Sequence, residues 1–242
     1  AADMGASVLQ CSWCFSPYVS GINSDADFKR LLQVEYEAIK YFVEKSNCAA
    51  MDGGIVIFAA GNDGVDAAGY PSAYNEYIAV TAFGPDGLPT AYTNYDKGCN
   101  IAAPGGEKDL GYESGRILST LPGNQYGYAE GTSMACPHVS GIAALALSYA
   151  LDNGYKFTTA ELNAMLLTSV NNIDDVLMGY HDTPTGERVS LKKYQGKMGT
   201  GMVDAYRTLM AIRGTKCIPV PLNTDASIVL NNYLGDGKLS MK

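Results

Sequence analysis

Short apolar runs recur along the first third of the chain. The runs at 6–11, 55–60 and 77–82 are rich in Val, Ile, Leu and Ala, which is typical of strands that are buried on both faces. The second and third runs stop at turns rich in Gly. Shorter strands are expected at 99–103 and 116–120. These runs predict the strands of a sheet.

Stretches with helical periodicity lie between and after these runs. Ser24 or Asp25 precedes the first stretch, whose apolar face consists of Phe28, Leu31, Leu32, Ile39, Phe42 and Val43. Further helices are expected at 133–151, 159–170 and 202–213. Strands that alternate with helices predict an α/β fold with a mainly parallel sheet and helices on both faces. Ligand sites in such folds lie at the carboxyl ends of the strands.

Charge and composition exclude some classes of function. A formal net charge of -8, with no basic run, argues against nucleic-acid binding. No apolar run approaches the ~18 residues of a membrane span, and residues 1–10 lack the basic start of a signal peptide. We therefore expect a soluble chain without a membrane span. Six scattered cysteines leave the redox compartment open.

The segment YAEGTSMACPHVSG, at 128–141, carries the first candidate for chemistry. Gly131 leaves the backbone open, and Ser133 is expected at the N-terminus of a helix. The unpaired N–H groups and the positive dipole end at such a terminus favour a developing oxyanion, which suits acyl transfer. The alternative is that Thr132 or Ser133 only caps the helix.

Asn62 is the second candidate. It follows the apolar run at 55–60, at the edge of the sheet where sites form, so its amide is positioned to donate to the same oxyanion. Taken alone, an Asn in a Gly-rich turn is usually a turn residue.

These residues resemble those of the subtilisin-like serine proteases, the subtilase family. GTSMACPHVSGIAAL at 131–145 resembles the nucleophile segment, and VIFAAGNDG at 56–64 resembles the segment with the oxyanion-hole asparagine. Four further segments match in order: GYPSAYNEYIAVTA, AAPGG, ILSTLPGNQYG and GTGMVDAYRTL. The resemblance implies that residues 1–214 are the C-terminal two-thirds of a catalytic domain whose N-terminal strands are absent from this chain. The tail at 215–242 changes in character and is expected to begin a following β module.

The resemblance also assigns roles to residues. Ser133 is implied as the nucleophile, and Asn62, with the Ser133 N–H, as the oxyanion hole. The residues implied to bind substrate are Ser12, Trp13 and Cys14 on the strand that pairs with a peptide, Ala59, Ala60 and Gly61 on the opposite wall, and Gly69 near the floor of the primary specificity pocket. Cys14 departs from the family, which usually has glycine there, and its side chain is expected to narrow the pocket. Asp63 at the rim either favours a basic substrate side chain or is a solvated turn residue.

The general base is the missing element. On a helix that begins at Ser133, His138 is rotated by roughly 140° from the nucleophile, so we interpret it as a structural histidine. His181 lies in a polar, turn-rich segment and is interpreted as a solvated loop residue. The resemblance implies the subtilase chain order Asp, His, Ser, and its spacing implies a base some ~20 to 30 residues before Ala1, with the acid further upstream.

Several expectations follow. The chain alone is expected to be inactive as a peptidase, because an adjacent base activates the serine. Its expected partners are a peptide or protein substrate, the missing N-terminal part of the catalytic domain, and a second copy of the chain through an exposed sheet edge. The family implies a secreted or cell-surface location and no cofactor. A weak cation held by carbonyls near Ser72, Tyr74 and Tyr77 is conceivable from the family but is not predicted.

Two other functions fit parts of the sequence. A non-catalytic subtilase-like module would hold a peptide in the same groove without cutting it, which would explain the absent base. A thiol redox protein would use Cys11 and Cys14, but a reactive C-x-x-C needs its first cysteine at a helix N-terminus, whereas Cys11 closes a strand.

Overall fold

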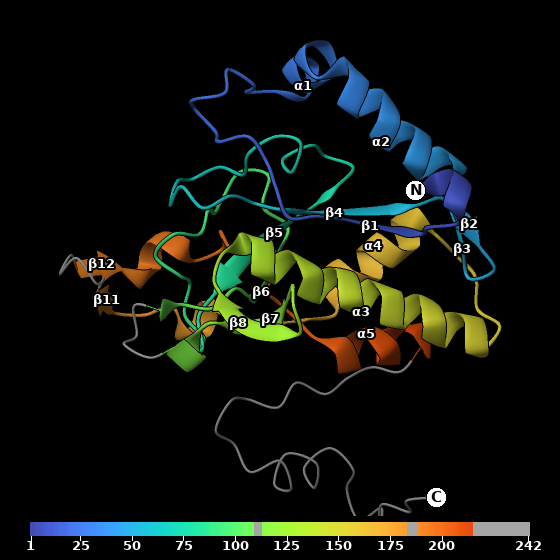
Figure 1. The fold of residues 1–242 in the computed structure, drawn as a ribbon. Helices are drawn as coiled ribbons and strands as arrows, with labels where there is room; N and C mark the ends of the chain where they lie inside the picture. Colours follow the sequence, from blue (N-terminus) through green and yellow to red (C-terminus); the bar gives the residue numbers. More distant parts are fainter. Residues whose placement is uncertain (109–112, 183–187, 215–242) are drawn as a thin grey trace, which may run out of the picture.

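The chain folds as a mainly parallel sheet with helices on both faces (Figure 1), in a computed structural model that describes residues 1–108, 113–182 and 188–214. The order of the strands in the sheet is β1 (Val8–Cys11), β4 (Ile55–Ala59), β5 (Ile78–Phe83), β6 (Ile101–Pro104), β13 (Met202–Val203) and β10 (Val170–Asn171). All neighbours are parallel except β13 and β10. The predicted α/β class is confirmed.

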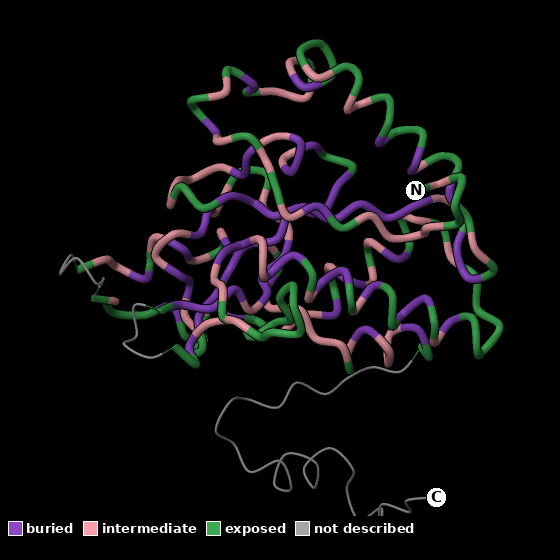
Figure 2. Tube along the Cα trace, in the orientation of Figure 1, coloured by how far each residue is buried: buried purple, intermediate pink, exposed green. Residues whose placement is uncertain are grey.

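The central strands β4 and β5 are buried along their whole length (Figure 2). Successive side chains of a strand point to opposite faces. In β4, Ile55, Ile57 and Ala59 therefore face the core under α3 (Thr132–Asp152), whereas Val56 and Phe58 face the core under α1 and α2. Burial on both faces explains why β4 reads as a continuous apolar run.

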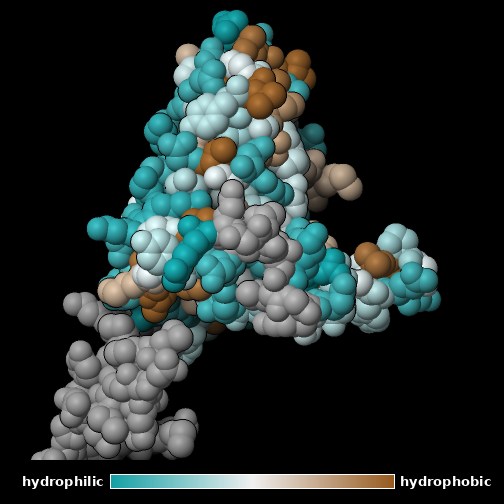
Figure 3. Space-filling model, turned by 90° about the vertical axis from the view of Figure 1, so that its left-hand side faces the viewer, coloured by the Kyte–Doolittle hydropathy of each residue, from teal (hydrophilic) through white to brown (hydrophobic). Residues whose placement is uncertain are grey.

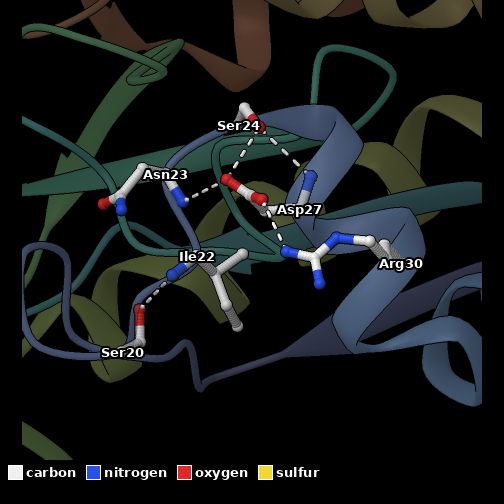
Figure 4. A network of polar contacts seen from close by, with 6 residues as sticks. All are labelled: Ser20, Ile22, Asn23, Ser24, Asp27 and Arg30. Atoms are coloured by element: carbon white, nitrogen blue, oxygen red, sulfur yellow. Dashed lines mark hydrogen bonds and ion pairs between the residues drawn. The ribbon is translucent and has the colours of Figure 1, made fainter.

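The first helical stretch forms two helices, α1 (Asp25–Leu31) and α2 (Gln33–Lys45). The Ser24 side chain accepts a hydrogen bond from the Asp27 N–H at 3.1 Å and donates to the Asp27 carboxylate, which also pairs with Arg30 (Figure 4). Ser24 is therefore the N-cap. The break at Leu32 was not predicted, because Leu32 still packs on the core and preserves the apolar spacing.

Helix α3 crosses the sheet on the other side from α2 and packs against β1, β4, β5 and β6. By length and mean hydropathy α3 meets the criteria for a membrane span. This was not predicted from the sequence, because polar residues interrupt its apolar run. Its buried residues, such as Val139 and Ala143, lie in the main core. A core helix gives the same signal as a membrane span.

The remaining elements include three corrections. The strand expected at 116–120 is β7 (Ile117–Leu121). It pairs with β8 (Gln125–Ala129) in a hairpin that is separate from the main sheet. The helix expected from 202 begins later, as α5 (Ala205–Ile212), because Asp204 caps it. His181 lies on β11 (Tyr180–Asp182), paired with β12 (Arg188–Ser190), and not in a loop.

The other short elements surround the sheet. They are β2 (Asn47–Cys48), β3 (Met51–Asp52), β9 (Phe157–Thr158), α4 (Thr159–Thr168) and the 3₁₀ turns Ala2–Met4, Glu113–Gly115, Asp174–Val176 and Leu191–Tyr194. The expected β module at 215–242 lies outside the described residues. Figure 3 shows a mostly hydrophilic end face, with apolar side chains gathered toward the top, where α1 and the loop before it lie.

Candidate active site

Ser133 is the second residue of α3, at the carboxyl-end edge of the sheet. The N-cap of this helix is Gly131, with φ 142°. Neither Thr132 nor Ser133 is therefore the cap, and the alternative that one of them only caps the helix is wrong. Such a backbone conformation favours glycine. Ser133 is half-buried, and its own N–H belongs to the first turn of the helix, where amides have no helical partner. The hydroxyl and a potential oxyanion donor therefore lie on the same residue.

Thr132 connects α3 to the end of β4. The Asn62 Oδ1 accepts hydrogen bonds from the Thr132 N–H at 2.9 Å and from the Thr132 hydroxyl at 2.8 Å. The Thr132 hydroxyl in turn accepts from the Gly61 N–H at 3.2 Å. Because these bonds use Oδ1, the Asn62 amide is fixed in one orientation and its Nδ2 is available as a donor.

Ser12, just after β1, is bonded reciprocally to Ser133. Its hydroxyl donates to the Ser133 carbonyl at 2.7 Å, and the Ser133 hydroxyl donates to the Ser12 carbonyl at 3.1 Å. Gln10 on β1 donates to the Ser12 hydroxyl and to the Cys136 sulfur. These contacts tie the sheet-edge strand to the start of α3. The hydroxyl of Ser133 is thus a donor to a neutral carbonyl and is not activated.

A hollow of about 250 Å³ opens beside Ser133. Its lining residues are Trp13, Cys14, Ser16, Ala59, Gly61, Asn62, Asp63, Thr132 and Ser133. Most of the residues implied as substrate-binding therefore meet around one hollow. Three of them do not line it: Ser12, which bonds Ser133 instead, and the buried Ala60 and Gly69, expected at a wall and at the floor.

Two residues of the site were not found from the sequence. Ser16 donates to the Asp63 carboxylate at 2.6 Å. Asn94 is fully buried, and its amide donates to the Ala60 carbonyl and to Asp63, while its Oδ1 accepts from the Asp63 N–H at 2.8 Å. The Thr-Asn-Tyr context of Asn94 gives no signal for this role, because only the fold brings it under the Gly61 turn.

Trp13 combines the two roles considered for it. Its ring lines the hollow, is 43% exposed, and packs edge-on against Phe58 at 5.3 Å between ring centroids. It also contacts Phe15 edge-on. A substrate-facing position and a packed aromatic are therefore compatible here.

The cysteines do not support a thiol redox function. Cys11, Cys14, Cys48, Cys99 and Cys136 are free thiols, and Cys217 lies outside the described residues. Burial, more than the nearby thiol or carboxylate, raises the pKa of Cys11 and of Cys14 to about 11. A reactive thiol has a lowered pKa, so the burial of these two thiols opposes this alternative.

The two histidines of the chain do not serve Ser133. The Nδ1–H of His138 donates a hydrogen bond to the carbonyl of Met134, one turn earlier on α3, at 2.8 Å. This bond within the helix is consistent with a structural role. His181 lies on the β11–β12 hairpin, which is remote from α3 in the chain and absent from the lining of the hollow. Among the residues described, no cluster of three His, Cys, Asp or Glu is placed to hold a metal. A carbonyl site near Ser72 would not appear in such a search, so the absence of a cofactor stays a prediction.

Ser133 at the start of α3, the oriented Asn62 and the hollow beside them lie together in this structure. The chain belongs to the subtilase family, peptidase S8, whose model matches residues 1–198. It is similar to the extracellular basic protease of Dichelobacter nodosus, with 32% identity over 170 residues, which are 67% of this chain and 24% of that protein. It is also similar to the major intracellular serine protease of Bacillus subtilis (strain 168), with 37% identity over 132 residues, 52% of this chain and 39% of that protein.

Solved structures show the same fold. The prenylagaramide maturation protease PagA aligns with a TM-score of 0.61 at 22% identity, over 88% of this chain and 64% of that one. The self-cleaved protease domain of PatA aligns with a TM-score of 0.59 at 20% identity, over 89% and 65%. The chain thus spans well under half the length of the two curated relatives and about two thirds of the two solved chains.

Proposed function

We propose that this chain supplies the nucleophile, the oxyanion hole and the substrate groove of a serine endopeptidase. The observation that carries the proposal is the orientation of Asn62. Its Oδ1 is occupied by both donors of Thr132, which leaves Nδ2 to donate at the hollow that Ser133 also lines. An oxyanion hole requires such a side-chain donor beside the nucleophile.

In the proposed mechanism, the Ser133 Oγ attacks the scissile carbonyl as a base takes its proton. The carbonyl π electrons move onto the oxygen, and the resulting oxyanion accepts hydrogen bonds from the Asn62 Nδ2 and the Ser133 N–H. The protonated base then gives its proton to the leaving amine as the C–N bond breaks. Water and the same base hydrolyse the acyl-serine in the reverse sense.

The base and the acid that orients it are proposed to come from polypeptide outside these 242 residues. Neither histidine of the chain bonds Ser133, because His138 bonds its own helix and His181 lies on the β11–β12 hairpin, outside the lining of the hollow. The Ser133 hydroxyl donates to the Ser12 carbonyl instead. That bond would be exchanged for one to the base on assembly.

The structure offers a surface that fits such a segment. Strand β1 ends the described sheet and pairs only with β4 there, so its other edge is open to a further strand. On α3, the exposed residues Pro137, Gly141, Ala144, Leu145 and Ser148 recur at helical spacing and carry no charge. An uncharged helix face with small residues suits the close approach of another helix. We propose that the segment with the Asp and the His covers both surfaces.

Labelling with a fluorophosphonate probe tests the proposal. The chain is treated alone and together with the upstream polypeptide of its parent, and modified residues are identified by mass spectrometry. Labelling of Ser133 only in the mixture, and none with Ser133→Ala, supports a nucleophile that needs an external base. Labelling of Ser133 in the isolated chain would refute the external base, and no labelling of a stable complex would refute the peptidase.

One observation favours a second function. Within residues 1–108, 113–182 and 188–214 the Ser133 hydroxyl bonds a carbonyl and no base, so the groove is also suited to bind a peptide without cutting it. Peptide binding by a complex that never reacts with the probe would establish this function.

Self-association through the open β1 edge is proposed as the alternative use of that surface. Gel filtration at several concentrations measures it, and a strictly monomeric chain would contradict it.

A secreted or cell-surface location is proposed by analogy with the extracellular relative of Dichelobacter nodosus. The relative of Bacillus subtilis is named as intracellular, so family membership does not decide between them. Fractionation of producing cells into medium, surface and cytoplasm tests the location. Recovery in the cytoplasm alone would overturn it.

A further inference from the structure

Cys14 lines the hollow beside Ser133, and its sulfur lies close to both Gly61 and Gly69. Cys14 and Gly61 are both lining residues, whereas Gly69, which lies beyond them, is buried and is not part of the lining. The hollow therefore ends before it reaches Gly69. The cause is visible in the spacing around the Cys14 sulfur.

The sulfur of Cys14 occupies the gap between two glycines. A Cβ added at Gly61 would lie 3.2 Å from this sulfur, and one added at Gly69 would lie 2.9 Å from it. The gap between the two glycines exists because neither has a side chain. Ordinary van der Waals contact between carbon and sulfur needs more room than these distances leave. The thiol thus fills space that would otherwise deepen the hollow.

The backbone holds Cys14 firmly in this place. The Phe15 N–H, next in the chain, donates to the Tyr70 carbonyl at 2.7 Å. A Cβ at Gly69 would clash with the Phe15 carbonyl oxygen, so the two segments are in close contact. On the other side of Cys14, Ser12 is bonded reciprocally to Ser133. Neither neighbour leaves the Cys14 backbone free to withdraw its side chain from the gap.

We propose that Cys14 sets the substrate specificity by closing the primary pocket to all but small side chains. The inference rests on the proposed peptidase function, because it concerns the residue that precedes the scissile bond. With the reacting carbonyl between Ser133 and Asn62, that side chain enters the hollow. Ala, Ser or Gly fits above the sulfur, whereas the ring of Phe or Tyr would need the volume the sulfur occupies.

Asp63 offers a competing specificity, because its carboxylate lies at the rim of the same hollow. A basic side chain would be its natural partner. However, one carboxylate oxygen accepts from the Ser16 hydroxyl at 2.6 Å and the other from the Asn94 amide at 3.2 Å. The carboxylate thus already has two donors and anchors the turn. A preference for small residues over Lys separates the two possibilities.

The test compares peptides that differ only in the residue before the scissile bond, which is Ala, Phe or Lys. With the assembled full-length protein, kcat/KM is expected to be highest for Ala. In Cys14→Gly, kcat/KM for Phe is expected to rise by about 10-fold or more relative to Ala, since even one extra methylene in an apolar pocket changes discrimination by roughly that factor. Cys14→Ser is the matched control, because it keeps a side chain of similar size and should keep the preference for Ala.

Binding separates a failure of this inference from a failure of the proposed function. The same peptides are titrated against the Ser133→Ala protein, with and without Cys14→Gly, by fluorescence polarisation. A shift in the ratio of the Phe and Ala dissociation constants supports the inference even if fluorophosphonate never labels Ser133. An unchanged ratio in Cys14→Gly, or a wild-type preference for Phe or Lys in binding, overturns it.

Discussion

Strands β4 and β1 both end at the edge of the sheet where the candidate site lies, but they differ in burial and in the number of partner strands. Every residue of β4 is buried, with side chains in both cores and partners on both edges. In β1 only Cys11 is buried. The strand β1 pairs with a single neighbour, β4, in the described sheet. The Asn62 side of the candidate site is thus supported by the core, whereas the Ser12 side depends on β4 and on the bonds between Ser12 and Ser133.

The largest effect is expected at the end of β4. In the assembled enzyme, Asn62→Ala should lower kcat by about 100- to 1,000-fold, because one oxyanion donor is lost. Asn62→Asp keeps an acceptor for both Thr132 donors but places a negatively charged oxygen where Nδ2 was. It should therefore keep the α3 junction and lose at least this factor in kcat, because the carboxylate also repels the oxyanion. An Asn62→Asp enzyme with nearly full kcat would remove Asn62 from the oxyanion hole.

Core truncation compares the two strands directly. Ile57→Ala in β4 removes a fully buried side chain and should lower the free energy of unfolding by about 2–5 kcal/mol. Leu9→Ala in β1 removes a half-buried one and should cost clearly less. Urea denaturation measures both, with Ile57→Val as the conservative control at about 0.5–1.5 kcal/mol. Equal losses of unfolding free energy at the two positions would show that β1 is supported by its core contacts as strongly as β4.

The anchor of β1 should have a smaller effect. Ser12→Ala removes the 2.7 Å hydrogen bond to the Ser133 carbonyl, which is worth about 1 kcal/mol of stability. Gln10→Ala is the matched control, since it leaves the bonds between Ser12 and Ser133 in place. The difference between the two variants in urea denaturation measures the anchor. If Gln10→Ala costs more than Ser12→Ala, the anchor lies elsewhere.

The last comparison concerns pH and predicts no effect at neutral pH, only a loss above about pH 9. Burial raises the pKa of Cys14 from 9.0 to about 11, so the folded state keeps the thiol protonated where the unfolded chain ionises. The associated stability is present below pH 9 and is lost as the pH rises through about 11, at no more than about 1.4 kcal/mol per pH unit. The pKa values of buried Tyr77 and of partly buried Tyr92 are also raised, mainly by desolvation, and act in the same direction. The measurement is therefore the difference between wild type and Cys14→Ser in urea denaturation across this range, and parallel pH profiles would contradict it.

Much of the fold was predictable because the central strands are buried on both faces. Runs such as 55–60 then read as unbroken apolar stretches, and Ser24 and Gly214 marked helix ends correctly. Errors arose where tertiary contacts acted on weak local patterns. Leu32 breaks a helix without breaking its apolar spacing, and the 116–120 strand has no sequence feature that distinguishes a hairpin from a sheet strand.

The sequence by itself determined the family, the nucleophile candidate and the asparagine, because each lies in a short contiguous motif. It also determined that Cys14 is larger than the expected glycine. Only the tertiary structure decided what these residues do to one another. The Asn62 orientation depends on Thr132, the anchoring of the turn on Asn94, and the depth of the hollow on a sulfur between Gly61 and Gly69. These are contacts between segments far apart in the chain, and their distances are set by how the strands and α3 pack.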